Sequence, residues 1–483
     1  MNSDYFTVKM MKKGSVETSK LRALLEDGMH PCWRRVDTDL MDPLLGALQA
    51  RLGGESPAPL EVARALAAEV RRTVDAIAAL REGHEAFNQR HSAMRSEAEL
   101  RENILAYAAE LGAGAKELRG DRRAFRRFFG HDAMVARFQC RHGDLQRELA
   151  FLLERLGTVA RRAFGEAGSP EEAWRELALE PLMTPLLEFD GDARVATSAL
   201  RGLSWSIAGL PEALRDAVLG VNVVQAIYRL SLDRERDVWI QCEAVALLRA
   251  ISAKFFDHVA TLRLTDPPAG DDLFVRRRLV ALVAARPGLH DLLGNVSDDP
   301  SPFVRQGITE CFTTLAPEIA LPLLARLAIK DGEPPVRAAA LLQIPSLGGA
   351  GADPGALSGI LVVSLREETD TYVQRVAIKI AADTHATLPE SGREAWRAAL
   401  LPALRRVHLE GDSLPARRWA AQARERIWCD SAAERRALLL RVRETARAIA
   451  PGKGAWLKDE TAAAMDDEPL GRVLSVAAQD DFG

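Results

Sequence analysis

Apolar residues recur every three or four positions through most of the chain, which is the spacing of one face of an α-helix. The stretch from Pro59 to His91 shows it most clearly, with apolar side chains at positions 60, 63, 67, 70, 74 and 77. This seam is compatible with a coiled coil, but it lasts under four heptads, so we favour a bundle helix. Runs of β-branched residues are few, and we therefore expect an almost all-α chain.

Capping residues mark where several helices begin. Ser96-x-x-Glu99 forms a capping box, and Ser169 followed by Pro170 is a second strong helix start. Between these two points the pattern predicts helices at about 121–129, 132–141 and 144–164. We place a domain boundary near residue 168, between the last of these helices and the start at Ser169.

The chain is expected to have four parts. They are an irregular lead-in at 1–37 with one short helix at 19–27, an N-terminal helical domain at 38–168, a helical-repeat array at 169–450, and an acidic mobile tail at 451–483. Between residues 452 and 483 there are seven acids against three bases and few large apolar residues. Such a composition cannot bury enough apolar surface to fold by itself, so we interpret this part as a tail.

A short pattern returns along the predicted array. A small or β-branched residue lies just inside the second helix of each unit, and a second apolar or small residue follows it four positions later on the same helix face. We call the first of these the anchor of the unit. The anchors are Val195, Val238, Val275, Val304, Val336, Val373 and Ala416, spaced by 29 (Val275 to Val304) to 43 residues (Val195 to Val238). A unit of that size holds two helices and two turns.

An aspartate and an arginine recur six residues apart around the anchors. The aspartate lies in the turn, where its carboxylate can cap the helix, and the arginine lies one turn into the helix. Stacked units would bring the aspartate of one unit beside the arginine of the next, as a ladder of charge-assisted hydrogen bonds. The pairs are Asp271 and Arg277, Asp299 and Arg305, Asp331 and Arg337, and Asp412 and Arg418.

The Asp…(Pro)…Val-Arg…Ala pattern at 299–308, 331–340 and 271–282 resembles HEAT repeats of the armadillo-like superfamily. The resemblance covers about half of the chain and is poorest at Asp190, Asp233 and Asp370. It implies an α-solenoid that serves as a binding scaffold, with the second helices on its concave side. Gln306 and Arg375, each two positions after an anchor, would then face the groove. The motif is a stacking device and implies no catalytic activity.

Charge, cysteines and hydropathy narrow the class of protein. The 64 basic and 68 acidic residues nearly balance, which argues against a general nucleic-acid coat. The five cysteines are far apart and form no Cys-x-x-Cys pair, so we expect free thiols in a reducing compartment. No apolar run reaches the roughly 18 residues of a membrane span. The predicted location is the cytoplasm, with no membrane association.

Candidate chemistry is sparse. Hydrolase, kinase, zincin and dinucleotide motifs are absent from the sequence, and we assign no catalytic, metal-binding or cofactor-binding residues. His131, Cys140 and His142 come nearest to a metal or nucleophile site, and His84 and His91 share one helix face; we interpret both groups as ordinary helix residues. Trp419 and Trp428 could form an aromatic binding patch, although large aromatics in a solenoid more often pack between repeats.

Two segments are strongly basic, with net charges of +6 at 113–165 and at 393–447. The candidate contacts for an acidic partner or phosphate are Arg122, Arg123, Arg126, Arg127, Arg405 and Arg406. We expect a non-enzymatic scaffold for a protein partner; the alternative is a protein that binds nucleic-acid phosphates through these arginines. The acidic tail is itself a candidate ligand for one of the basic ends, because it is tethered to the array.

Overall fold

The computed structural model of the chain describes residues 16–27, 38–53, 57–112, 130–166, 169–189, 191–210, 219–265, 272–349 and 351–428. All regular elements within these ranges are helices. This confirms the expected fold class, an all-α chain with an N-terminal helical bundle followed by an α-solenoid. The chain forms two compact units, Met1–Val259 and Ala260–Gly483. The boundary that we expect near residue 168 therefore lies inside the first unit.

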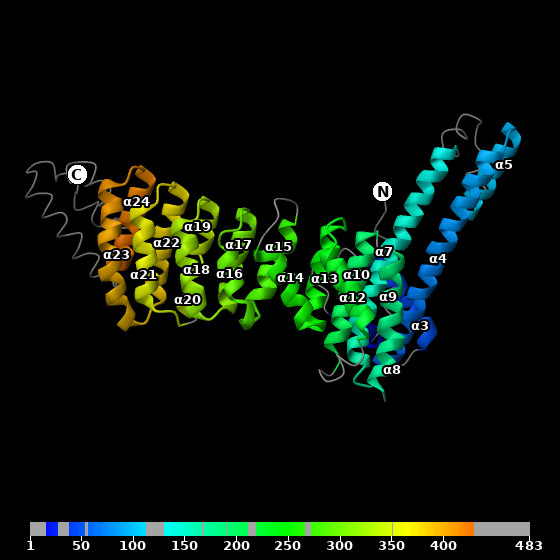
Figure 1. Cartoon of the computed structure of the whole chain (residues 1–483), viewed down its shortest axis with the longest axis horizontal. Helices are drawn as coiled ribbons and strands as arrows, with labels where there is room; N and C mark the ends of the chain where they lie inside the picture. The colour runs from blue at the N-terminus through cyan, green and yellow to red at the C-terminus, as the bar shows by residue number, and fades with distance from the viewer. Residues whose placement is uncertain are drawn as a thin grey trace, which may run out of the picture. The chain divides into compact units, whose positions relative to one another are not determined.

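The first unit is a packed set of helices of very different lengths (Figure 1). In chain order they are α1 (Val16–Leu25), α3 (Thr38–Leu52), α4 (Pro59–Ala93), α5 (Glu97–Glu110), α7 (His131–Ala163), α8 (Pro170–Trp174), the π-helical segment η2 (Arg175–Leu179), α9 (Glu180–Glu188), α10 (Ala193–Ala208), α12 (Val221–Leu232) and α13 (Val238–Ile251). The division between the two units falls within the next helix, α14 (Ala253–Thr265).

Helix α7 is the centre of the first unit, since it packs against α1, α4, α5 and α10. The sequence pattern predicts two helices here, 132–141 and 144–164, but the structure has one continuous helix that passes through Gly143. An isolated glycine costs a helix only about 1 kcal/mol. Packing along most of the length of α7 offsets that cost, which local sequence signals cannot show.

Arginines of α7 hold the first helices of the chain in place. The buried guanidinium of Arg155 donates to the carbonyl oxygen of Leu25 at 2.7 Å, at the end of α1. Arg147 donates to both carboxylate oxygens of Asp39 in α3, at 2.8 and 2.9 Å. The short helix that we expect at 19–27 within the lead-in is present as α1, anchored by a residue 130 positions away.

The axes of α7 and α10 come closest at Gly157 and Gly202. A Cβ atom placed on Gly157 would lie 2.4 Å from the Cα and carbonyl oxygen of Gly202. One placed on Gly202 would lie 2.6 Å from the carbonyl oxygen of Leu153. Because the atoms in the way are backbone, only glycine allows the two helices to pack at this distance.

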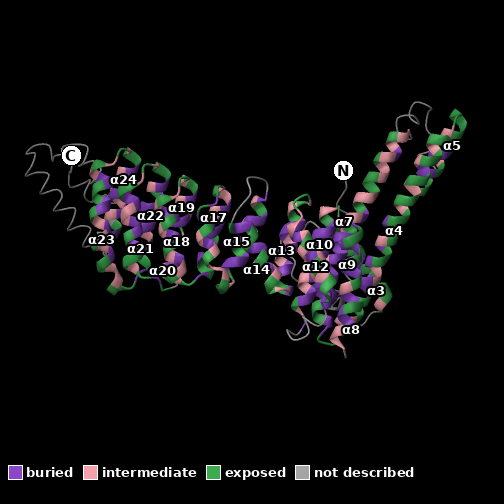
Figure 2. Ribbon diagram, in the orientation of Figure 1, coloured by how far each residue is buried: buried purple, intermediate pink, exposed green. Residues whose placement is uncertain are grey.

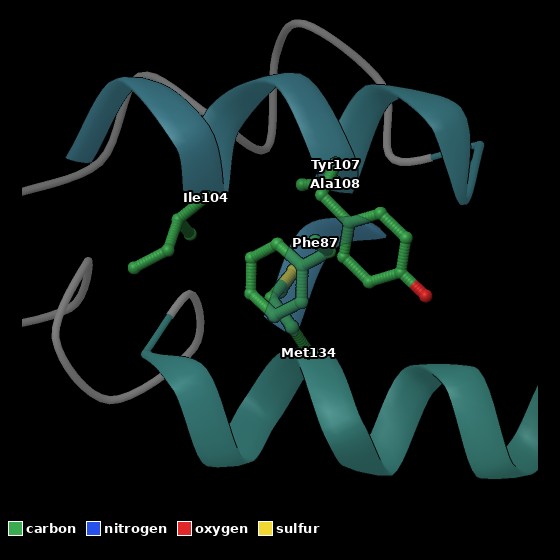
Figure 3. Close-up of a cluster of buried hydrophobic side chains, with 5 residues drawn as sticks. All are labelled: Phe87, Ile104, Tyr107, Ala108 and Met134. Atoms are coloured by element: carbon green, nitrogen blue, oxygen red, sulfur yellow. The ribbon is translucent and has the colours of Figure 1, made fainter. Parts of the chain in front are cut away.

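The C-terminal end of α4 and the N-terminal end of α7 form, together with α5, a small separate core. Figure 3 shows its side chains converging from the three helices: Phe87, Ile104, Tyr107, Ala108 and Met134. Helix α5 begins at the capping box that the sequence predicts, with both hydrogen bonds between Ser96 and Glu99 present. We call this region the tip.

The second unit consists of helix pairs arranged in two layers (Figure 1). Second helices pack on second helices in the order α15, α17, α19, α22, α24, and first helices in the order α18, α21, α23. Figure 2 shows buried residues on the inner sides of these helices and exposed residues on the outer sides. The elements are α15 (Leu273–Ala284), η3 (Pro287–Leu289), α16 (Asp291–Val296), α17 (Pro302–Cys311), η4 (Phe312–Thr314), α18 (Pro317–Lys330), α19 (Pro334–Leu341), α20 (Ile344–Gly349), α21 (Pro354–Glu367), α22 (Thr371–Thr387), α23 (Glu390–Glu410) and α24 (Leu414–Trp428).

The expected anchors of the second unit are buried in the structure: Val275, Val304, Val336, Val373 and Ala416. In α13 of the first unit the anchor is Ile240, which is 1% exposed, rather than the expected Val238. The N-cap of that helix is Asp237. The buried position is the third of the helix, as it is for Val373 after its own N-cap, Asp370.

Replacing Gly157 by alanine tests the close packing of α7 and α10. We expect the substitution to destabilise the first unit by about 1–3 kcal/mol, the usual effect of overpacking a core. Gly143→Ala in the same helix is the matched control, because a Cβ there meets no atom within 4 Å. This control should gain about 0.5–1 kcal/mol from better helix propensity. Urea denaturation would measure both; equal effects of the two substitutions would contradict the packing argument.

Candidate functional site

In the second unit, the residue that directly follows the anchor connects neighbouring helix pairs in α15, α17 and α19. Arg305 follows the anchor Val304, and its Nη1 donates to the carbonyl oxygen of Asp299, in the turn of its own unit, at 2.7 Å. Its Nε and Nη2 donate to the two carboxylate oxygens of Asp331, in the turn of the next unit, at 2.7 and 2.8 Å. One guanidinium thus binds both its own turn and the following one.

Arg337 repeats this arrangement one unit later. It donates to the carbonyl oxygen of Asp331 at 2.8 Å and to both carboxylate oxygens of Glu368 at 2.7 and 2.8 Å. The Asp331 and Glu368 side chains are only 2% and 5% exposed, so neither charge could be buried without such a partner. Hydrogen bonding to these carboxylates raises the pKa of Arg305 and of Arg337 above the ordinary value.

At the N-terminal end of the second compact unit, the connecting residue is Arg276, which follows the anchor Val275. Its Nε lies 2.9 Å from Asp299 and its Nη1 donates to Asp272 at 2.5 Å, with all three side chains buried. We refer to the connected groups as the charge ladder: Asp272, Arg276, Asp299, Arg305, Asp331, Arg337 and Glu368.

The contacts run opposite to the expected direction, because the arginine of one unit binds the acid of the next unit. Arg277, the first arginine of the expected ladder, takes no part in them. Arg277 lies one position too far along α15, and its Nη1 donates to the carbonyl oxygen of Phe303 at 2.7 Å. It also lies over the Phe303 ring, 4.1 Å from the centroid, and pairs with Glu310. Asp271 lies outside the described residues.

The charge ladder ends at α22. Gln374 follows the anchor there and donates to the carbonyl oxygen of Glu368 at 2.5 Å. The amide is neutral and shorter than a guanidinium, so it offers no charge to the next turn. Asp412 and Arg418 are both exposed, and within the described part of the chain no hydrogen bond or ion pair joins them. These two residues of the expected ladder therefore lie outside the series of contacts described above. The residue in frame is Arg417, which donates to the carbonyl oxygen of His408 at 2.9 Å.

Where the ladder ends, a hollow of about 260 Å³ opens between α22 and α24. Its floor is apolar, with Ile378 2%, Ala382 2% and Ala423 3% exposed. Its rim is polar and aromatic, with contributions from Arg375, Lys379, Trp419, Gln422 and Arg426. We call it the α22–α24 hollow.

The rim carries more positive than negative charge. Arg375 is exposed and its guanidinium lies over the Trp419 ring, 5.1 Å from the centroid. A carboxylate close by is that of Asp383, which lies 2.9 Å from Arg426 and 3.9 Å from Lys379. Tyr372, 57% exposed, precedes Arg375 by about one turn of α22. The side chain of Trp428 lies outside the described residues.

Many arginines of the second basic segment serve the fold. Arg397 donates to the carbonyl oxygen of Ile427 at 2.9 Å, and Arg424 lies 2.8 Å from the imidazole of His408. Arg405 and Arg406 are exposed on α23, and Arg406 pairs with Glu410 at 3.3 Å. The other candidate contacts, Arg122, Arg123, Arg126 and Arg127, lie outside the described residues.

The histidines of the first unit gather at the tip. His84 Nδ1 lies 3.0 Å from the Tyr107 hydroxyl, and His84 Nε2 lies 3.2 Å from the side-chain amide of Asn88. Asn88 in turn contacts His131 Nε2 at 3.1 Å, and the His131 ring lies 4.8 Å from that of His91. Sequence spacing alone does not bring these residues together, because they come from α4, α5 and α7.

Burial, and then the charge of His131, lower the pKa of His84 and of His91 below the ordinary 6.5. Both imidazoles are therefore neutral at physiological pH. Other titratable groups around them are Tyr107, whose pKa burial raises to about 12, Glu110, and Asp132, which lies 3.7 Å from His131.

The described parts of the chain differ in three respects from metal-binding, membrane-spanning and thiol-dependent proteins. There, no group of three or more His, Cys, Asp or Glu side chains is placed to hold a metal ion. None of the described helices is both long and apolar enough to cross a membrane. Cys242 and Cys311 are buried thiols, and burial raises the pKa of Cys311 to about 11. A thiol so far from ionisation is a packing residue rather than a nucleophile.

The helix pairs and their ladder define the class of protein: this is a helical-repeat protein of the α-solenoid kind. A scan against models of known protein families finds no match, and a search of curated proteins finds none either. Among solved structures, the chain is similar to a crystal structure of a Kap121p mutant, with 15% identity and a TM-score of 0.39. The similarity covers 97% of this chain and 54% of that one, so this chain spans about half its length. A likeness this weak adds nothing to the functional argument.

Arg305→Ala tests the charge ladder. We expect a loss of about 1–3 kcal/mol, because the substitution leaves the Asp331 carboxylate buried without its bidentate partner. The matched control is Arg326→Ala, which removes an exposed pair with Asp298 and should cost under about 1 kcal/mol. Thermal melting would compare them. If Arg305→Ala left the melting temperature unchanged but abolished partner binding, Arg305 would be a contact residue instead.

The tip should loosen in acid. The folded-state pKa values of His84 and His91 lie below the ordinary 6.5, so their contribution to stability is complete above that pH. It is lost as the pH falls through the folded-state values, since protonation then favours the open form. Hydrogen exchange of α5, corrected for intrinsic rates, should accelerate between neutral and mildly acidic pH. A His84→Gln/His91→Gln variant should lose most of this dependence; an unaltered profile would contradict the assignment.

Proposed function

We propose that this protein is a non-enzymatic scaffold, built on a HEAT-like solenoid, that binds a protein partner on the second-helix layer of its second unit. The observation that carries the proposal is the α22–α24 hollow. It combines an apolar floor with three basic side chains and an accessible indole. Tryptophan, tyrosine and arginine are the residues that most often dominate protein–protein binding energy.

The repeat architecture suits this role. Each helix pair contacts its sequence neighbours, so the array offers a continuous row of second helices to a partner. The charge ladder keeps adjacent second helices in register, while residues two positions after the anchors, such as Arg375, are left for contact. The partner segment should be acidic, because the rim has Arg375, Lys379 and Arg426 against Asp383.

Nucleic-acid binding is the second candidate. Exposed Arg405 and Arg406 on α23 favour it, since guanidiniums in reach of solvent can contact phosphates. Against it, Arg397, Arg417 and Arg424 of the same segment bind main-chain carbonyls or imidazoles within the fold. A nucleic-acid backbone would need a row of exposed basic side chains along the array. A single hollow fits a short peptide segment better. For the location we propose the cytoplasm, whose reducing conditions suit the buried thiols of Cys242 and Cys311.

A charge-reversal pair tests the proposed function. Arg375→Glu/Lys379→Glu alters the rim of the hollow, and Lys330→Glu/Arg366→Glu makes the same change in charge at exposed positions on the first helices. Proteins captured from the native host by the unaltered chain would be identified, and their direct affinity for each purified variant measured. We expect about tenfold weaker binding for the rim variant, equivalent to about 1.4 kcal/mol, and little change for the control.

Two outcomes would contradict the proposal. One is an equal loss of affinity in both variants, which would show general electrostatic attraction. The other is capture that disappears on nuclease treatment and falls steeply with salt, which would favour the nucleic-acid alternative.

A further inference from the structure

The α22–α24 hollow has the chemistry to accept a short segment in which carboxylates lie beside a large apolar side chain. The buried surfaces of Ile378, Ala382 and Ala423 form an apolar floor. The cations of Arg375, Lys379 and Arg426 surround it. An apolar side chain on the floor would exclude water from the rim, and the ion pairs there would strengthen as a result.

The positive charge of the rim is only partly compensated within the described residues. Asp383 lies close to Arg426 and at 3.9 Å from Lys379, so one carboxylate serves two cations. The guanidinium of Arg375 lies against the Trp419 ring, a contact worth roughly 0.5–1 kcal/mol at an exposed site. Among the residues that the structure describes, Arg375 forms no ion pair, so its guanidinium can still bind a carboxylate.

The chain itself carries a segment of this composition. Residues 466–470 read Asp-Asp-Glu-Pro-Leu, three carboxylates followed by a proline and a leucine. A residue that precedes a proline is biased toward extended backbone, so we expect the segment to bind in an extended form. An extended segment presents successive side chains in different directions, which allows Leu470 to reach an apolar floor while the acids meet the rim.

Position along the chain favours this occupant. Helix α24 contributes Trp419 and Arg426 to the hollow and ends at Trp428, and Asp466 follows Trp428 by 38 residues. A tether of this kind converts binding into an intramolecular step with an effective concentration on the order of 1 mM. A weak site, with a dissociation constant of about 100 μM, would then be occupied most of the time.

We infer that the segment Asp466–Leu470 docks in the α22–α24 hollow of its own chain, with its carboxylates on the rim cations and Leu470 on the floor. The inference rests on the proposed function, because it makes the segment an internal competitor of the acidic partner. A partner must displace the segment, so the affinity of the full chain is lower than that of the hollow alone.

The test uses a fluorescein-labelled synthetic peptide of residues 461–474 and two proteins, the full chain and a variant without residues 452–483. Fluorescence anisotropy at low salt should show the peptide binding the shortened protein. Binding to the full chain should be about tenfold weaker, which follows from an effective concentration near 1 mM and the dissociation constant above. Arg375→Glu/Lys379→Glu in the shortened protein should abolish binding, whereas Lys330→Glu/Arg366→Glu should not.

Peptide variants separate the two halves of the interaction. Replacing Asp466, Asp467 and Glu468 by Asn, Asn and Gln should abolish binding, and Leu470→Ser should weaken it without removing its salt dependence. Equal affinity of the peptide for the full and shortened proteins would overturn the inference. So would self-association of the full chain that is lost with residues 452–483, since the occupant would then come from a second copy.

Different outcomes of these experiments contradict the inference and the proposed function. If the shortened protein fails to bind the peptide while partner binding still depends on Arg375 and Lys379, the internal competitor is wrong and the scaffold proposal stands. If neither the peptide nor any protein partner responds to the rim variant, the hollow is not a binding site and both fall.

Discussion

The second unit depends on a guanidinium that holds two turns at once. Arg305 and Arg337 each bind a carbonyl oxygen of their own turn and a buried carboxylate of the next. Burying a carboxylate is costly unless it is fully paired, so the register between helix pairs is strongly specified wherever such a contact exists. Hydrophobic contacts between the layers are less directional and would tolerate sliding. The ladder therefore sets the spacing that the apolar core then fills.

In the first unit, the register between helices is set by a close approach of two helix backbones. Gly157 and Gly202 let the backbones of α7 and α10 touch, and no other residue type fits the observed distance. Arginines of α7 then fasten α1 and α3 from the side, through Arg155 and Arg147. Both units thus use a few specific contacts to position helices whose stability comes mainly from apolar burial.

Much of this arrangement could be predicted from the sequence. Helical periodicity gave the fold class, and the anchors located the second helices of the second unit. The ladder was harder, because the six-residue spacing placed Arg277 and Arg418 in a frame one position too late. The frame is set by the anchor: the residue directly after it points to the neighbouring turn, and the next one lies about 100° further round the helix. Glu368 was missed because the sequence pattern used Asp370, which caps α22, as the acid of that turn.

The tip and the hollow could not have been found from local patterns, for different reasons. The histidines of the tip come from three helices, and only packing brings them together. The hollow depends on an interruption: Gln374 occupies the connecting position of α22, and a neutral amide cannot draw the carboxylate of Asp412 into the layer. Between the described residues of α22 and α24 the buried ion pair is absent, and beside the apolar core an exposed side chain, Arg375, lies over Trp419 with open space next to it. Residues that depart from a regular structural pattern are often functional, because the pattern itself stabilises the fold. Here the departure, within the described part of the array, is the missing contact between arginine and carboxylate at α22. By this argument the glutamine at this repeat position, where other units have arginine, leaves open the surface that we propose as the binding site.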